Sequence, residues 1–319
     1  MNFPRRALLA TPFLAAPAAA QTGPLRLIVP FPPGGGTDVL ARRYAARLAT
    51  VLGQPVIVEN RTGAAGAIGT AEGARARPDG TTLILGTAST MSFYPTMAER
   101  PAYQPLDAFT PLGMLGTLPA AFGAKIPGTL TLAEAIAQAR ARPGTLRYGS
   151  PGTGTFLHIA MLLLLREAGG AEMIHVPYRG SSPAMADLIG GHIDLVVDTL
   201  ATSIEAHRGG RVRILAIAGT ARSPLALDIP TVAEALNLPS FEASLWMSAV
   251  VPAATPADIT ARLERATAQV VNDPAYRAEL ESAGITALEP LGTAQTRAFF
   301  AAETARWRPV IEASGARLE

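Results

Sequence analysis

The chain of 319 residues contains no cysteine and only four histidines. Without cysteine there can be no disulfide bond, no thiolate nucleophile and no cysteine-ligated metal. No two histidines stand three or four residues apart, so no helix carries a pair of histidine ligands on one face. We therefore expect neither a metal ion nor a cofactor.

Charged residues are also scarce, at 16% of the chain, whereas apolar residues reach 49%. This balance is typical of a globular protein rather than a disordered one. The chain has 27 basic residues, of which only Lys125 is a lysine, and 25 acidic residues. If Arg5 and Arg6 are removed with a leader, 25 basic residues remain (27 − 2 = 25), so net charge gives no reason to expect a nucleic-acid or membrane partner.

No apolar segment is long enough to span a bilayer, and the one at the N-terminus has the pattern of a secretory leader. Arg5 and Arg6 precede the small, apolar stretch Ala7–Ala19, whose last alanines fit the A-x-A cleavage rule. We expect residues 1–20 to be a signal peptide that is cleaved near Ala20. The arginine pair leaves the general secretory and the twin-arginine export routes both open.

The 299 residues that remain (319 − 20 = 299) are more typical of two domains than of one. Strand and helix patterns alternate over residues 25–85 and again over 146–218, which predicts parallel sheets in two separate regions. Between them, residues 91–112 have no clear period, and we expect an irregular segment there.

Two apolar segments, Met114–Lys125 and Leu245–Val251, predict two crossings between these regions. The fold class we expect is α/β, with two lobes joined by two crossings at a hinge. The first lobe would comprise residues 21–122 and 249–319, and the second lobe residues 123–248. A cleft between two such lobes is a usual place for a ligand.

Helix starts are marked by capping residues. Thr131 and Thr231 each stand three residues before a glutamate, which is a capping box. Thr37 is expected to cap the helix of residues 39–52, and Ser182, followed by Pro183, is expected to cap another.

Two glycine-rich loops, residues 31–38 and 149–155, each follow a short apolar run and open a helix. The start of a helix offers free backbone N–H groups and the positive end of the helix dipole, and glycine lets a ligand come close to them. One such junction is a common anion site. Two of them, a domain apart, predict an anionic ligand held between the lobes, although both loops could also be structural turns.

Other uses of these loops fit less well. The interpretation of the first loop as a dinucleotide-binding fingerprint is weakened, because the third glycine of that fingerprint would fall at Val39. Glu59, however, ends the next strand as a ribose-binding acid would. The second loop has Thr155 where a P-loop has lysine, and Tyr148 where a hydrolase nucleophile elbow has glycine. No complete catalytic constellation is visible, so we do not expect an enzyme.

Four further side chains could face the cleft. His158 lies one turn into the helix after the second loop, as a ligand contact or as a core-edge residue. Asp198 follows the apolar run 193–197, where parallel sheets bind ligands but where a helix cap is also possible. Tyr178 could line one side of the cleft. Trp246 could lie at the hinge, line the cleft or belong to the core.

The motifs together resemble the receptors of tripartite tricarboxylate transporters, also called the Bug family. The similarity extends in order, and with the expected spacing, over nearly all of residues 25–318. The segments that carry it are Val29–Asp38, Val58–Gly66, Pro78–Gly80, Tyr148–His158, His175–Gly180, Arg222–Pro224 and Ile229–Glu234.

This resemblance implies a periplasmic solute-binding protein of the two-lobed, type II-like kind, which acts as a monomer. It would capture a small carboxylate and deliver it to a membrane permease; a sensor input without a transport partner is the alternative. The family holds one carboxylate between the two glycine loops, partly through ordered waters.

The resemblance also implies which residues bind the ligand. The first loop would contribute Phe31, Gly34, Gly35, Thr37 and Asp38, and the second loop Ser150, Gly154, Thr155 and His158. Thr87 and Ser89 would line the first lobe, and Tyr178, Asp198 and Thr199 would meet the variable end of the ligand. Val197, where the family often has phenylalanine, and the bulky pair Phe156 and Leu157 are departures near the part of the pocket that selects the ligand.

Overall fold

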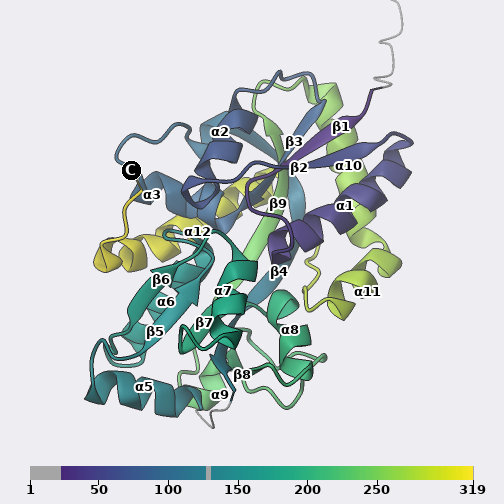
Figure 1. Cartoon of the computed structure of the whole chain (residues 1–319). Helices are drawn as coiled ribbons and strands as arrows, with labels where there is room; N and C mark the ends of the chain where they lie inside the picture. The colour runs from purple at the N-terminus through teal and green to yellow at the C-terminus, as the bar shows by residue number, and fades with distance from the viewer. Residues whose placement is uncertain (1–22, 127–130, 319) are drawn as a thin grey trace, which may run out of the picture.

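The computed structural model describes residues 23–126 and 131–318. The predicted signal peptide lies outside the described residues. Figure 1 shows two lobes, the lower one drawn largely in teal, which are joined by β4 (Phe109–Lys125) and β9 (Ser244–Pro252). The prediction of an α/β fold with two lobes and two crossings is therefore confirmed. None of the described helices combines the length and the apolar character that a membrane span requires.

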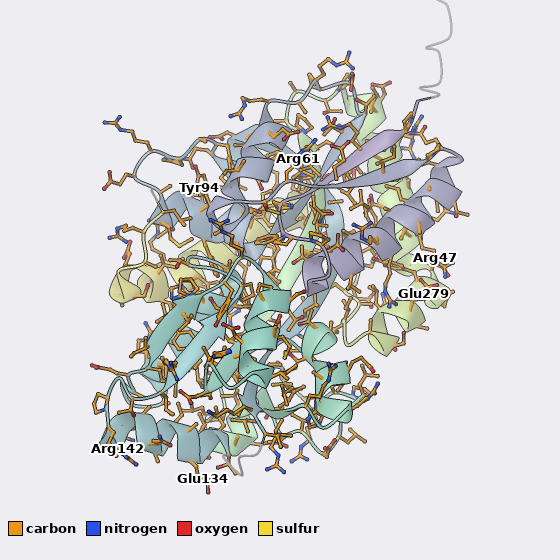
Figure 2. The ribbon with its side chains drawn as sticks, in the orientation of Figure 1. Arg47, Arg61, Tyr94, Glu134, Arg142 and Glu279 are labelled. Carbon is orange, nitrogen blue, oxygen red and sulfur yellow. The ribbon has the colours of Figure 1, made fainter. Side chains whose placement is uncertain are left out.

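The first lobe is built on a sheet in which two parallel pairings are followed by antiparallel ones. Its strands lie in the order β2 (Val56–Asn60), β1 (Leu25–Val29), β3 (Thr82–Thr87), β9 and β4. Its helices include α1 (Gly36–Leu52), α2 (Ala67–Ala74), α10 (Ala257–Asn272) and α11 (Pro274–Ser282). Figure 2 shows Arg47 of α1 and Glu279 of α11 pointing toward one another, and the two side chains form an ion pair that ties these helices together.

The second lobe repeats the alternation of strand and helix. Its strands lie in the order β4, β7 (Leu195–Thr199), β5 (Arg147–Ser150) and β6 (Ile174–Pro177), and β8 (Val212–Ile217) also pairs with β4. Its helices are α5 (Leu132–Ala141), α6 (Phe156–Glu167), α7 (Ser181–Ile189), α8 (Leu200–Arg208) and α9 (Val232–Leu236). β5 pairs in parallel with both β6 and β7, so these three strands end at the same edge.

Strand β4 belongs to both lobes. It pairs antiparallel with β9 as far as Pro119, and from Ala120 onward it pairs with β7 and β8. The two crossings therefore lie side by side as neighbouring strands. A rotation of one lobe on the other requires a change in only this short stretch of backbone.

The irregular segment that we expected over residues 91–112 is partly wrong. It contains the end of a π-helical turn, η2 (Ala88–Phe93), the short helices α3 (Tyr94–Met97) and α4 (Pro105–Ala108), and the start of β4. The strand begins at Phe109 because Phe109 and Leu112 are buried, and Pro111 is accommodated where the register with β9 shifts.

Two predicted helix caps are also wrong. Helix α1 begins at Gly36 with Gly35 as its N-cap, and α7 begins at Ser181 with Gly180 as its N-cap, so Thr37 and Ser182 lie inside their helices. Because glycine has no side chain, it occupies the N-cap position without a side-chain hydrogen bond. Each helix therefore begins earlier than the capping rule predicts. The caps at Thr131 and Thr231 are confirmed.

Aromatic packing joins the lobes behind the crossings. Phe93 of η2 and Trp307 of the final helix α12 (Thr293–Ser314) belong to the first lobe, and both contact Phe156 at the start of α6. The ring centroids of Phe156 lie 5.8 Å from Phe93 and 5.4 Å from Trp307. The start of α6 is thus inserted into the apolar core of the first lobe.

Candidate functional site

A small cavity of about 40 Å³ lies between the two lobes. From the first lobe it is lined by Phe31, Pro32, Gly35, Gly36, Thr37 and Ser89, and Leu245 of β9 also lines it. From the second lobe it is lined by Pro151, Thr155, Phe156, Leu157, Gly180, Ser181, Asp198 and Thr199. Both lobes therefore contribute to one site.

Four helices begin at this cavity. The N-cap residues of α1, α6, α7 and α8 all line it, and they are Gly35, Thr155, Gly180 and Thr199. Each of these helices follows a strand, so the site lies at the strand ends where α/β sheets bind ligands. Four converging helix starts place the positive ends of four helix dipoles around one small space, which favours an anion there.

Several N–H groups at these helix starts are free to bind a ligand. Within residues 23–126 and 131–318, the N–H groups of Gly36, Thr37 and Leu157 have no protein acceptor. Other first-turn donors are already used. The N–H of Phe156 donates to Ser89 Oγ across the lobes at 2.9 Å, and the N–H of Thr199 donates to Asp198 Oδ1 at 2.7 Å.

No lysine, arginine or histidine is among the described residues that line the cavity, and Asp198 is the one ionisable side chain there. A ligand anion would therefore be held by backbone N–H groups, hydroxyl groups and helix dipoles alone. Such neutral donors can bind a carboxylate well in a site from which water is excluded.

The first loop is held in shape by Asp38, which does not line the cavity. Asp38 Oδ2 accepts from the N–H of Gly34 at 3.0 Å and from Arg42 Nε at 2.9 Å, and Oδ1 accepts from Asn60 Nδ2 at 2.9 Å. Burial opposes ionisation of Asp38, but the hydrogen bonds from Arg42, Asn60 and Gly34 outweigh it and lower the pKa of the carboxyl. Asp38 thus fixes the backbone of the first loop at Gly34. Gly34 itself has a φ of +83°, a conformation that favours glycine.

Gly36 lies tightly against Thr199 of the second lobe and against Leu118 of β4. A methyl group at this position would lie 2.7 Å from Thr199 Oγ1 and 2.6 Å from Leu118 Cδ2. Only glycine leaves room for α1 and α8 to begin against one another in this arrangement. A methyl group at Gly180 would similarly lie 3.1 Å from the ring of Pro32, so the lobes are in contact on both sides of the cavity.

The second loop rests on two stacked histidine rings. His158 Nδ1 accepts from the N–H of Gly154 at 3.2 Å, and the ring of His158 stacks on that of His175 with centroids 4.1 Å apart. Ser150 Oγ lies 2.7 Å from His175 Nε2. Burial, together with the neighbouring His175, lowers the pKa of His158 to about 3, and burial lowers that of His175 to about 4. Both rings are therefore neutral near pH 7 and support the loop from behind.

Asp198 is the most unusual side chain of the site. It is 1% exposed, and its Oδ1 accepts from the N–H of Thr199 and, at 2.9 Å, from Ser181 Oγ. Its Oδ2 is buried without a hydrogen-bond partner. Burial raises the pKa of Asp198 to about 6, although the nearby hydroxyl of Thr202, the N–H of Thr199 and Ser181 oppose the rise; the Thr202 hydroxyl itself donates to the carbonyl of Thr199 at 3.0 Å.

The structure separates the predicted ligand-binding residues into two groups. Those that line the cavity are Phe31, Gly35, Thr37, Ser89, Thr155, Asp198 and Thr199. Those that do not line it are Gly34, Asp38, Thr87, Ser150, Gly154, His158 and Tyr178. In this second group, the N–H of Thr87 donates to Thr90 Oγ1 at the start of η2, and the Tyr178 hydroxyl donates to Asp187 Oδ2 at 2.6 Å. Most of the second group support the two loops.

Sequence reasoning missed Gly180 and Ser181, although the signal that could have found them is present. They follow β6 in the same way that the two glycine loops follow β1 and β5, and the ends of neighbouring parallel strands meet at one edge. The other lining residues that were not predicted as ligand-binding are Pro32, Gly36, Pro151, Phe156, Leu157 and Leu245. Trp246, by contrast, is a core residue: it stacks on Phe300 and its indole N–H donates to Glu303.

Comparison with known proteins identifies the family. Residues 40–316 match the family described as tripartite tricarboxylate transporter family receptor. Protein BugT of Bordetella pertussis is 36% identical, in an alignment covering 98% of this chain and 96% of that protein.

Two solved structures resemble the fold closely. Rpa4515 of R. palustris, solved with adipate, has a TM-score of 0.86 and 31% identity, covering 93% of this chain and 99% of that one. MatC (Rpa3494) from Rhodopseudomonas palustris, solved with bound malate, has a TM-score of 0.83 and 30% identity, covering 91% of this chain and 99% of that one. The family match spans most of the chain and the curated relative aligns over nearly all of it. The protein with four helix starts around one inter-lobe cavity therefore belongs to the tripartite tricarboxylate transporter receptor family of periplasmic solute-binding proteins.

Proposed function

We propose that this protein is a periplasmic receptor that closes its two lobes around a small carboxylate and delivers it to the membrane permease of a tripartite tricarboxylate transporter. The observation that carries the proposal is the convergence of four helix N-caps on a cavity that has no basic side chain among the described residues. This arrangement supplies fixed donors for one carboxylate without a full opposing charge.

In this proposal the ligand carboxylate lies between the starts of α1 and α6. The unpartnered N–H groups of Gly36, Thr37 and Leu157 are its donors, with the hydroxyl of Thr37 beside them. The ring stack behind Gly154 and the hydrogen bonds of Asp38 keep both loops in place before the ligand arrives. Preorganised donors reduce the entropy that is lost on binding. The adipate and malate structures of two relatives support a carboxylate as the ligand class.

The proposal also requires the lobes to move. We place the hinge in β4 and β9 and propose lobe boundaries near residues 122 and 249. In support, β4 exchanges its partner strand between Pro119 and Ala120. The contacts between Phe156 and Ser89 and between Gly36 and Thr199 exist only when the lobes are together. A ligand that touches both lobes stabilises this closed state because it gains contacts that the open state lacks. We further propose that the mature monomer starts after a leader of residues 1–20.

Thermal unfolding of the mature protein in the presence of small carboxylates tests the ligand class. A ligand at 100 times its Kd adds roughly 2.7 kcal/mol to the free energy of unfolding, which gives a clear rise in Tm. Nucleotides and neutral sugars are the matched negative probes. If one of them raises the Tm while mono- and dicarboxylates do not, the proposed ligand class is wrong.

Co-purification from membranes tests the partner. The proposal predicts that the liganded protein retains a permease, whereas capture of a sensor kinase alone would indicate a signalling role. The first result supports delivery to a transporter, and the second contradicts it.

A further inference from the structure

The carboxylate of Asp198 also restricts which ligand groups can bind in the cavity. The side chain is 1% exposed and lines the cavity, yet its Oδ2 has no hydrogen-bond partner. Its other oxygen, Oδ1, already accepts from the N–H of Thr199 and from Ser181 Oγ. A buried acceptor without a donor is costly, so a ligand gains most at this point by bringing a donor.

No cation is available to neutralise Asp198 from the elements that pack around β7. In the part of the chain that the structure describes, no basic side chain forms a hydrogen bond or an ion pair with Asp198; Arg166 is exposed at the end of α6, and most of the other ionisable groups have partners elsewhere. His158 of α6 accepts from Gly154, Asp187 of α7 accepts from Tyr178, and Lys125 of β4 pairs with Asp194. On α8, Arg208 pairs with Glu205 and His207 accepts from Ile214, while Asp38 of α1 pairs with Arg42 and Tyr148 of β5 stacks on His175.

A dicarboxylate would therefore meet an unfavourable environment. If one carboxylate lies on the starts of α1 and α6, the second one faces the ionised Asp198 in a site with no basic side chain among its described lining residues. Two like charges in a space from which water is excluded repel strongly, and one of them must take up a proton. An amide, ammonium or hydroxyl group avoids this repulsion and fills the vacant acceptor.

The cavity also has apolar lining. Phe31, Pro32, Pro151 and Leu245 contribute hydrophobic surface to the same space that the helix starts and Asp198 line. The site thus combines donors for a carboxylate, apolar surface and one buried carboxylate acceptor.

We infer that the preferred ligand is a small carboxylate whose far end carries a hydrogen-bond donor aimed at Asp198 Oδ2, rather than a second carboxylate. The inference rests on the proposed function, because it takes the binding of one carboxylate at the helix starts as given. Asp198 is then the residue that sets specificity, and a dicarboxylate binds only together with a proton.

Calorimetric titration with an isosteric pair of ligands tests this inference. Adipate and its monoamide differ only by an oxygen and an amino group, and shorter pairs of four and five carbons extend the series. At about pH 8 the wild type should bind the monoamide at least about tenfold more tightly than the matched dicarboxylate, the effect of one unsatisfied or repelled buried group. Asp198→Asn keeps the shape but offers N–H donors, so it should reverse the preference. The Tm of the unliganded variant checks that it folds.

Proton uptake in the wild type tests the same inference without any substitution. Titration in two buffers of different ionisation enthalpy should show uptake of about one proton with the dicarboxylate and none with the monoamide. Dicarboxylate affinity should rise by up to tenfold per pH unit between about pH 8 and pH 6, while monoamide affinity stays level.

Equal affinities for both members of each pair, with no proton uptake, would overturn the inference and leave the proposed function intact. If no carboxylate in the series binds, the proposed function fails and the inference fails with it. If Asp198→Asn does not fold, the wild-type proton count alone decides between the two results.

Discussion

Substitution of Gly36 by alanine should weaken ligand binding by preventing full closure of the lobes. The added methyl group would lie 2.7 Å from Thr199 Oγ1 and 2.6 Å from Leu118 Cδ2 in the closed arrangement. Leu118 is buried in the core of the first lobe, to which Gly36 also belongs, so this clash is present whether the lobes are open or closed. Thr199 Oγ1 has less freedom, because it lies 3.0 Å from Thr202 Oγ1 and its residue caps α8.

The magnitude follows from the cost of overpacking. Forcing an extra methyl group into a well-packed region costs about 1–3 kcal/mol, which corresponds to an affinity loss of about 5- to 150-fold if the cost falls on the closed state alone. The contact with Leu118 destabilises the open state as well, an effect that is offset by up to about 1 kcal/mol because alanine is a better helix former than glycine.

Gly35→Ala is the matched control. Its methyl group would lie 3.7 Å from Ser181 Oγ, which is an ordinary contact, and its φ of −80° is accessible to alanine. Calorimetry with a bound carboxylate should therefore show a large loss of affinity for Gly36→Ala and a much smaller one for Gly35→Ala. The unliganded Tm of Gly36→Ala measures the part of the cost that comes from Leu118 and does not depend on closure. Wild-type affinity in Gly36→Ala, or an equal loss in Gly35→Ala, would refute the argument that closure depends on this contact.

Three further outcomes follow from the same contacts. Ligand binding should change the fluorescence of Trp307 more than that of Trp246, because Trp307 contacts Phe156 of the second lobe. Comparison of Trp246→Phe with Trp307→Phe tests this. A ligand-induced fluorescence change that persists in Trp307→Phe would contradict it. Asp38→Ala should release the first loop and lower affinity by about tenfold or more, because it removes a buried carboxylate that accepts from Gly34, and unchanged affinity would show that the loop holds its shape without it. The pKa of His158 is lowered to about 3, so the unfolded chain binds more protons than the folded chain between about pH 6.5 and pH 3, and the free energy of unfolding should fall on acidification through this window. In acid unfolding, His158→Gln should make this pH dependence flatter. An unchanged slope would contradict the lowered pKa of His158.

The parts of the fold that the sequence predicted are those set by local rules. The capping boxes at Thr131 and Thr231 depend on residues three positions apart, and both helices begin where the rule places them. The glycine loops could likewise be recognised from a strand, a turn and a helix in succession. The two crossings were visible because both strands are predominantly apolar.

What could not be predicted depends on contacts between distant segments. Gly35 and Gly180 cap their helices without a side chain, so no capping pattern marks them. Asp38 was placed in the clamp, but Asn60 from the next strand turns its carboxylate toward the loop backbone. Tyr178 was placed on the cavity wall, but Asp187 on the following helix binds its hydroxyl. Each of these orientations is decided by a partner that no local pattern identifies.

A crystal structure of the protein with its tightest-binding carboxylate is the most direct test of the central claim. The account predicts one carboxylate group at the starts of α1 and α6, within hydrogen-bond distance of the N–H groups of Gly36 and Leu157 and with no lysine or arginine touching it. A carboxylate paired with a basic side chain, or bound away from these helix starts, would contradict it.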